Sequence, residues 1–387
     1  MDADTLEQLV AAVRRFARER LVPREAQIAE QDHVPAELLA EMRALGLFGL
    51  TVPEEYGGMG LTASEEARAM LELSWASVAI RSAIGINLGI GSQGLVMDGT
   101  EAQKRQWLPR LAAGEITAAF CLTEPDSGSD SASLKTRAVR DGSDYVITGS
   151  KRFITNAPHA GLFTVMARTS AETLPANAHI SAFLVPAGIR GLIVGKPDRK
   201  MGQQGAHTAD VTFDAVRVPA DALLGGAEGR GFRTAMQVLD RGRISIGVVC
   251  VGQGERILHE ALSYSMARRQ FDQRIADFQL IQAMLADSQA DLYAARCMVL
   301  ETARRYDAGE RISMEASCCK MFASEMVGRI ADRAVQIHGG AGYMRDTPAE
   351  RFYRDVRLFR IYEGTTQIQQ LIIAKAMIRA AEQAGIG

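Results

Sequence analysis

Four long runs of helical periodicity near the C-terminus restrict the fold more than any other feature of this sequence. The runs cover residues 231–268, 279–307, 311–337 and 366–384. Apolar side chains recur in them at the spacing of one helix face. Helices of this length with short links pack side by side in alternating directions. The sequence therefore predicts an antiparallel four-helix bundle over residues 231–387.

The chain before this bundle changes character near residue 118. Residues 5 to about 117 show helical spacing, whereas the following segment has short β-branched and aromatic runs separated by turns. Such runs predict a small antiparallel β domain. Strands are expected at 135–139, 145–148, 162–167, 180–185, 211–213 and 216–218. The expected fold is mainly α with a β insert: an N-terminal helical domain (1–117), a middle antiparallel β domain (118–230) and the C-terminal four-helix bundle (231–387).

Composition excludes several classes of partner. The net charge of −2 on 387 residues offers no basic surface for nucleic acid or an anionic membrane. The most apolar long run, 75–96, contains Arg81 and Asn87, so we expect a buried helical region and no membrane span. The five cysteines lack CxxC spacing and favour a reducing compartment. Because the N-terminus also lacks targeting-peptide features, a cytoplasmic location is predicted.

Motifs for several common chemistries are missing. His259-Glu260 does not continue into HExxH, and no Cys/His cluster has zinc spacing, so no metal site is expected. There is no P-loop and no nucleophile elbow. The glycines at 339–342 follow a long helix, so they do not fit a dinucleotide-binding turn and by themselves indicate the end of a helix.

Two polar stretches near the start of the β region are candidates for a ligand site. Segment 121–130, CLTEPDSGSD, can present Thr123, Ser129 and backbone N–H groups, although a solvated interdomain loop would have the same composition. Segment 151–156, KRFITN, read as a strand, puts Phe153 and Thr155 on one face. An aromatic ring beside a hydroxyl suits a planar heteroaromatic ligand, and an ordinary half-buried strand has the same pattern.

A single carboxylate, Glu363, precedes the last helical run. In that segment alone, Gly364 makes a turn, Thr366 is the predicted N-cap, and Gln369 completes a capping box. Glu363 is then only the last loop residue. Other segments of the chain favour a different interpretation.

Several of these segments together resemble the acyl-CoA dehydrogenase family, flavoproteins that introduce a double bond α,β to a thioester. The resemblance is carried, in the family's order, by VPEEYGG (52–58), QKRQWLPR (103–110), CLTEPDSGSD (121–130), QIHGGAGY (336–343) and IYEGTTQ (361–367). Asp346, Arg351 and Asp355 follow QIHGGAGY at the spacing that the family shows after this segment. The family's helical, β and four-helix-bundle order agrees with the order expected here.

The resemblance implies FAD bound in an extended pose, in a homotetramer built from paired dimers. The matching cofactor contacts within one subunit are Phe120, Cys121, Leu122, Thr123, Ser129, Phe153, Ile154, Thr155, Thr365 and Gln367. Contacts to the neighbouring subunit's FAD are implied for Arg268, Phe271, Gln279, Gln336, Gly339 and Gly340. Loss of FAD and loss of the dimer should therefore be coupled. Two positions depart from the family pattern: Phe153 stands where many members have tryptophan, and Asp272 replaces a glycine beside the pyrophosphate contact.

The resemblance also implies that Glu363 is the catalytic base. It would remove the α-proton while the β-hydride goes to flavin N5, with the backbone N–H of Glu363 and a flavin ribityl hydroxyl stabilising the enolate. Desolvation would raise its pKa and its basicity. Substrate contacts are implied for Ser129, Asp240, Arg243, Tyr362 and Gly364. Gly242 occupies the position where some relatives carry the base, which favours Glu363 as the sole base. Asp240 and Arg243 could instead form a helix-surface ion pair.

The expected function is therefore FAD-dependent acyl-CoA dehydrogenation, in fatty acid or amino acid catabolism, with an electron-transferring flavoprotein as the acceptor. The alternatives are an acyl-CoA oxidase, a dehydrogenase of an acyl-carrier-protein thioester, a flavin monooxygenase, which Glu363 disfavours, and a non-catalytic binding protein. The sequence leaves the acyl group open, although residues 85–97 are expected to line the floor of its pocket.

Overall fold

A computed structural model describes residues 1–169 and 176–386. The N-terminal part is helical, as predicted, and packs on the bundle through a shared apolar core. Its helices are α1 (Ala3–Phe16), α2 (Glu25–Gln31), α3 (Ala36–Ala44), α4 (Ala63–Leu73), α5 (Val78–Leu88), α6 (Gln93–Asp98) and α7 (Glu101–Ala112). The apolar run that was expected to be a buried helical region contains α5 and α6, and α5 is buried along most of its length.

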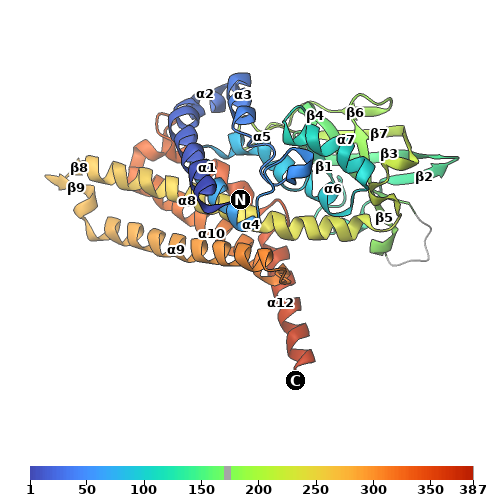
Figure 1. The fold of residues 1–387 in the computed structure, drawn as a ribbon. Helices are drawn as coiled ribbons and strands as arrows, with labels where there is room; N and C mark the ends of the chain where they lie inside the picture. Colours follow the sequence, from blue (N-terminus) through green and yellow to red (C-terminus); the bar gives the residue numbers. More distant parts are fainter. Residues whose placement is uncertain (170–175, 387) are drawn as a thin grey trace.

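The middle part is a sheet that lies beside these helices (Figure 1). Its strands are β1 (Thr117–Cys121), β2 (Arg137–Asp141), β3 (Asp144–Thr155), β4 (Ala160–Arg168), β5 (Ile180–Pro186), β6 (Leu192–Val194) and β7 (Thr208–Pro219), and their order is β1-β4-β2-β3-β7-β6 with β5 on β4. Most pairs are antiparallel, as predicted, while β1 and β2 both run parallel to β4. Each expected strand overlaps one of these, and β3 and β7 each join two expected segments.

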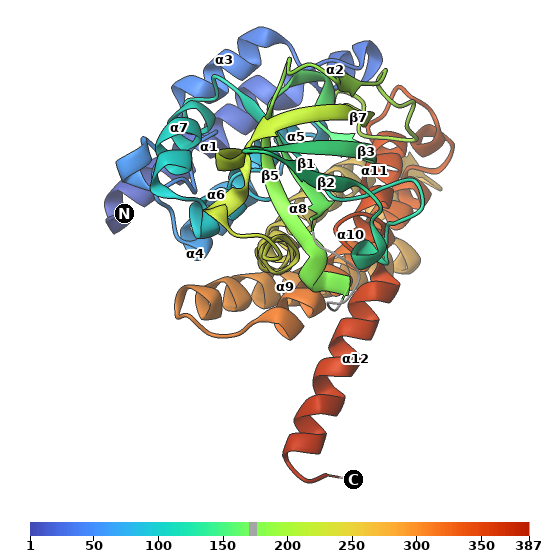
Figure 2. The same cartoon turned by 90° about the vertical axis from the view of Figure 1, so that its right-hand side faces the viewer.

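The C-terminal part contains the four predicted helices within two residues of their expected ends. They are α8 (Gly231–Ala267), α9 (Gln279–Asp307), α10 (Ser313–His338) and α12 (Thr366–Gln383), with α11 (Ala349–Val356) before α12. A hairpin of β8 (Arg269–Gln270) and β9 (Gln273–Arg274) joins α8 to α9 at the end of the bundle opposite the sheet (Figure 1). Most of α12 extends away from the body, as Figure 2 shows from the sheet side.

Hydrogen bonds of two buried side chains fix the sheet against the N-terminal helices. Asn87 on α5 donates to the carbonyls of Leu111 and Ile116 and accepts from the N–H of Ala118 on β1. Gln103 on α7 donates to two carbonyls in the segment that leads to α8. These bonds satisfy backbone groups that burial would otherwise leave unpaired, and they set the position of β1 relative to α5.

The described part of the chain contains no helix that is both long and apolar enough to cross a bilayer. It also contains no cluster of His, Cys, Asp or Glu side chains suited to hold a metal ion. The five cysteines are free thiols.

Candidate active site

A cavity of about 280 Å³ lies where the three parts of the chain meet, and we call it the junction cavity. It is bounded by α5, β1 and the loop after it, the end of β3, the first turns of α8, and the turn before α12. Eleven of the predicted site residues line it: Phe120, Leu122, Thr123, Ser129, Phe153, Ile154, Thr155, Arg243, Tyr362, Glu363 and Gly364. Residues 85–97, expected at the pocket floor, contribute Ile86 and Ile90.

Glu363 lies in a tight turn that other parts of the chain hold in place. Its φ is +53°, a left-handed conformation that costs a non-glycine residue about 1 kcal/mol or more, and Gly364 follows at φ +92°. Lys320 Nζ on α10 donates to the Gly364 carbonyl at 2.6 Å. The Gln369 amide donates to the carbonyls of Glu363 and Gly364 at 3.2 and 3.1 Å. These bonds fix the direction of the Glu363 side chain.

The predicted helix cap at this turn is wrong by one residue. Thr365 is the N-cap of α12, and its hydroxyl accepts from the N–H of Ile368. The Thr366 hydroxyl donates to Glu325 on α10 instead. Gln369 does not complete a capping box, because its amide holds the carbonyls of the turn.

One oxygen of the Glu363 carboxylate, Oε2, is buried and has no hydrogen-bond partner. It lies against α8 at Gly242, where an added Cβ would be 2.6 Å from it. Burial raises the pKa of Glu363 above its ordinary value, and the nearby charges of Arg81, Lys320 and Arg243 oppose that rise. A buried carboxylate oxygen without a donor at a cavity wall is available to accept a proton from a ligand.

The cations around Glu363 are themselves buried. Arg243 pairs with Asp240 at 2.5 Å, and Ser313 donates to the same carboxylate. The i,i+3 pair expected as one alternative therefore exists, with Arg243 buried and Asp240 partly exposed, and burial raises the pKa of Asp240. Burial also lowers the pKa of Lys320 to about 8.

The loop after β1 is held by a second buried ion pair. Lys151 on β3 donates to Glu124 at 2.8 Å, and Glu124 also accepts from the N–H of Thr136. Thr123 and Ser129 remain on the cavity wall. Cys121 has its side chain in the core of the sheet, where burial raises its pKa to about 12, so this predicted contact does not line the cavity with its thiol.

Phe153 presents an aromatic ring at the mouth of the cavity. It is 60% exposed, has φ +59° at an irregularity of β3, and lies under the Arg152 guanidinium. Strict alternation along a strand is interrupted here, yet Phe153 and Thr155 both line the cavity, as predicted.

Comparison with known proteins decides the family. Models of the acyl-CoA dehydrogenase N-terminal, middle and C-terminal domains match residues 3–115, 119–216 and 229–378. An acyl-CoA dehydrogenase of Bacillus subtilis is 40% identical over 95% of this chain and 96% of its own length. The chain belongs to the acyl-CoA dehydrogenase family.

Solved structures extend the likeness of this acyl-CoA dehydrogenase to the whole fold. Butyryl-CoA dehydrogenase from Megasphaera elsdenii has a TM-score of 0.93 and 33% identity, over 98% of this chain and 100% of that one. A chain solved in work on the electron transferring flavoprotein of Acidaminococcus fermentans has a TM-score of 0.93 and 36% identity, over 98% and 99%. A glutaryl-CoA dehydrogenase from Mycobacterium smegmatis in complex with FADH2 has a TM-score of 0.89 and 32% identity, over 97% and 95%.

Members of the family depend on FAD, and the junction cavity fits a flavin ring. Phe153 offers an aromatic face, Phe120 and Leu122 add apolar walls, and the hydroxyls of Thr123 and Thr155 offer hydrogen bonds. Glu363, with its unpartnered oxygen, shares the same cavity. A planar ring bound here would therefore exclude water from the carboxylate.

The other predicted contacts lie outside this cavity. Arg268, Phe271 and Gln279 are at or beside the β8–β9 hairpin, at the end of the bundle opposite the sheet (Figure 1). Gln336 is at the end of α10, with Gly339 and Gly340 just after it, and Thr365 and Gln367 are on the first turn of α12. Asp240 reaches the site only through Arg243. Asp272 has φ +63° in the exposed hairpin.

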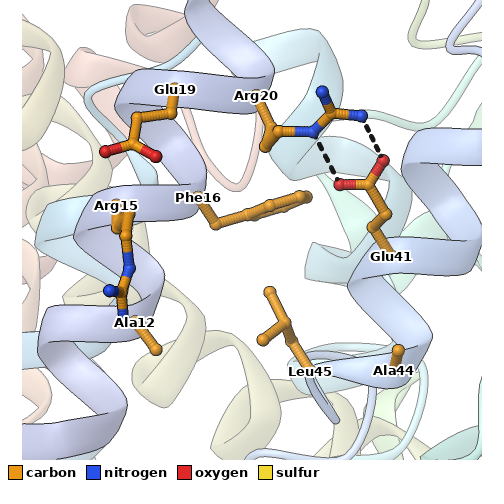
Figure 3. Close-up of a pocket in the computed structure, with 8 residues that line it drawn as sticks. All are labelled: Ala12, Arg15, Phe16, Glu19, Arg20, Glu41, Ala44 and Leu45. Atoms are coloured by element: carbon orange, nitrogen blue, oxygen red, sulfur yellow. Dashed lines mark hydrogen bonds and ion pairs between the residues drawn. The ribbon is translucent and has the colours of Figure 1, made fainter.

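A second hollow, between α1 and α3, shows none of these features (Figure 3). Arg20 and Glu41 on its rim form a two-bonded ion pair with each other, Phe16 projects into it, and Leu45 lines it. Arg15 and Glu19 also line it, but both side chains are exposed to solvent, whereas Glu363 is buried. The junction cavity is therefore the candidate active site.

Proposed function

We propose that this acyl-CoA dehydrogenase uses Glu363 to remove the α-proton of an acyl-CoA thioester. One observation carries the proposal: the buried, unpartnered Oε2 of Glu363 lies at the wall of the junction cavity. A carboxylate in bulk water is too weak a base for this reaction, while one shielded from water is stronger. The turn between Tyr362 and Thr365 aims the oxygen, so little reorganisation is needed when substrate binds.

Stabilising the enolate requires donors that are already in place. The described part of the chain offers no acceptor for the backbone N–H of Glu363, so this donor is free for a thioester oxygen. The bound flavin supplies the acceptor for the β-hydride. Of the predicted substrate contacts, Ser129, Arg243, Tyr362 and Gly364 share the cavity wall with Glu363, which supports a role in orienting the thioester.

We further propose that electrons pass from the reduced cofactor to an electron-transferring flavoprotein, in line with the fold likeness to a chain from work on such a protein. An acyl-CoA oxidase would share the first half-reaction and transfer electrons to oxygen. Peroxide released at the rate of turnover without another acceptor would favour the oxidase. An acyl-carrier-protein thioester is the other alternative, and parallel assays with both carriers distinguish it.

The proposed assembly is a homotetramer of paired dimers with FAD sites shared between subunits. Support comes from the position of Phe271 in an exposed hairpin, with Arg268 and Gln279 beside it, outside the junction cavity of their own chain. We also propose three domains, with boundaries at 117/118 and 230/231. The proposed location is cytoplasmic, and the proposed role is in fatty acid or amino acid catabolism.

The test is an anaerobic titration of the purified yellow protein with a panel of acyl-CoAs. Substrates of the proposed reaction bleach the flavin in a stoichiometric manner, and the enoyl-CoA product is identified by mass spectrometry. A fully loaded protein whose flavin stays oxidised with every thioester of the panel would refute the proposed function.

A further inference from the structure

Lys320 is a fully buried cation behind the turn that carries Glu363. Its side chain on α10 has no exposed surface, and the residues that line the junction cavity do not include it. A thioester bound in the cavity therefore does not pair with this charge. Burying a lysine costs free energy unless the ammonium group finds partners inside the protein, so its contacts indicate what it does there.

The ammonium group of Lys320 binds the backbone of the turn and not a carboxylate. Nζ donates to the Gly364 carbonyl at 2.6 Å. In residues 1–169 and 176–386, no carboxylate forms an ion pair with it. Gln369 on α12 donates to the same carbonyl, at 3.1 Å. Two side chains from different helices therefore hold one carbonyl, directly after the base.

The charge of Lys320 also acts on the base itself. Burial raises the pKa of Glu363, and three cations oppose that rise. In order of effect they are Arg81 on α5, Lys320 on α10 and Arg243 on α8. Arg243 also faces Lys320, and its own charge is paired with Asp240.

The other groups around Lys320 do not cancel its charge. It faces the thiol of Cys250 on α8 and the carboxylate of Glu325 on its own helix. Burial raises the pKa of the Cys250 thiol far above its ordinary value, so this group is neutral. Glu325 pairs with Arg360 at 3.1 Å. Among the groups that face Lys320 in the described residues, Glu363 is therefore the anion without an ion pair.

A buried general base must meet two requirements that conflict. It must be ionised before the substrate arrives, because a protonated carboxyl group cannot accept the α-proton, yet burial favours the protonated form. A hydrogen bond to the carboxylate would stabilise its charge, but the bond would occupy the oxygen and weaken the base. A cation that binds the neighbouring backbone stabilises the charge through space. It leaves Oε2 of Glu363 without a donor, as observed.

We infer that Lys320 is a positioning residue of the proposed reaction: it holds the Glu363 turn from behind and keeps the carboxylate ionised before substrate binds. This inference rests on the proposed function, because it assigns Lys320 a role toward the same base. A lysine that only stabilised the packing of the bundle would not affect the ionisation of Glu363. The titration of Glu363 therefore distinguishes the two roles.

The first experiment follows this ionisation without turnover. Infrared difference spectra of the FAD-loaded protein between pH 9 and pH 5 report the band of protonated carboxyl groups, and the Glu363 contribution is identified by its loss in Glu363→Gln. In Lys320→Met this band should appear at a higher pH than in wild type, because removing a nearby positive charge favours the protonated form. Lys320→Arg keeps the charge and should titrate like wild type, as should Lys375→Met, an exposed position on α12.

The second experiment measures the rate, with the acyl-CoA that bleaches the wild-type flavin fastest as the probe. The ratio of kcat/KM at pH 9 to kcat/KM at pH 6 should be at least about 5-fold larger in Lys320→Met than in wild type, because less of the base is ionised at pH 6. At pH 9 the base is ionised in both proteins. There kcat should still be lower by roughly 10-fold, with KM little changed, because the turn is held less firmly.

The outcomes separate this inference from the proposed function. An unshifted Glu363 band in Lys320→Met, or the same fractional loss of rate at both pH values, would show that Lys320 only stabilises the fold and would overturn the inference. If no thioester reduces the wild-type flavin, the proposed function fails, while the infrared titration still decides whether Lys320 controls the ionisation of Glu363. If Lys320→Met does not fold, Lys320→Gln removes the charge but keeps a donor, and it should shift the band in the same direction.

Discussion

At the scale of single residues, the base can be tested without changing its shape. Glu363→Gln keeps the size of the side chain but cannot accept the α-proton. The rate of flavin reduction by substrate should fall by roughly 10²–10⁴-fold, the usual contribution of a general base, while FAD content and acyl-CoA binding remain. Stopped-flow absorbance measures the rate. Reduction at the wild-type rate would show that another group takes the proton.

Gly242 provides a second test at this scale. Because it has no side chain, the Glu363 carboxylate can lie directly against α8. The Cβ of Gly242→Ala would lie 2.6 Å from Oε2 of Glu363 and would displace a flexible side-chain end rather than backbone. Stability should be unchanged or higher, since alanine favours a helix interior over glycine by about 1 kcal/mol. Activity should fall by roughly 10²-fold because the base is displaced.

Gly94→Ala on α6 is the matched control, since its Cβ would meet no atom closer than 3.3 Å, Thr234 Cγ2. Thermal unfolding and steady-state rates of the two variants are compared with wild type. Full activity in Gly242→Ala would mean that the carboxylate has room to move without loss of function.

Lys320 links the site to the pH dependence of stability. Its pKa is lowered from 10.5 in the unfolded chain to about 8 by burial. The folded protein therefore binds fewer protons here than the unfolded one between these values, so the free energy of unfolding should rise with pH across that window, by about 3 kcal/mol in total. Lys320→Met should lack this rise, measured by urea unfolding from pH 7 to pH 10. Lys375→Met, an exposed lysine on α12, should keep it.

At the scale of elements, Asn87 holds α5, the end of α7 and β1 together. Asn87→Leu would leave two buried carbonyls and the N–H of Ala118 unpaired, at about 1–3 kcal/mol for each group. We expect the unfolding free energy to fall by at least about 3 kcal/mol, with weaker FAD retention because β1 lines the junction cavity. Asn87→Asp, which keeps the acceptor to Ala118, should lose less. Equal denaturation midpoints for Asn87→Leu and wild type would contradict this account.

Elements with a strong periodic pattern could be predicted from the sequence, whereas contacts between distant elements could not. The long helices of the bundle follow from the spacing of their apolar residues. The cap at Thr365 does not, because Thr365 and Thr366 are chemically alike and the choice depends on a turn held by Lys320, 44 residues away from Gly364 in the chain. The parallel pairing of β1 with β4 depends on long-range contacts in the same way.

Motif resemblance predicts the residues of the candidate site, whereas its geometry depends on the fold. Glu363 alone looked like a loop residue, and only the approach of α8 at Gly242 explains its buried oxygen. In the sequence, Arg81 is only a charge that interrupts an apolar run. Its place at the cavity wall follows from the packing of α5 against α8, and no local pattern indicates it.

At the scale of the whole molecule, several large apolar side chains are left uncovered at the hairpin end of the bundle. Phe271 is 88% exposed, and Leu280 and Tyr343 are nearly as open. Exposed apolar groups gathered in this way mark an interaction surface. In the proposed assembly they meet the neighbouring subunit, close to its FAD.

This arrangement predicts that assembly and cofactor content fail together. Phe271→Asp places a charge on the exposed apolar surface, so it should lower the molar mass measured by light scattering and, in the same fractions, the ratio of flavin to protein absorbance. Val139→Asp is the control, because Val139 is also exposed but lies on β2, away from the hairpin. A Phe271→Asp monomer that retains a full complement of FAD would show that each chain holds its cofactor alone, because a shared site cannot stay filled once the partner has gone.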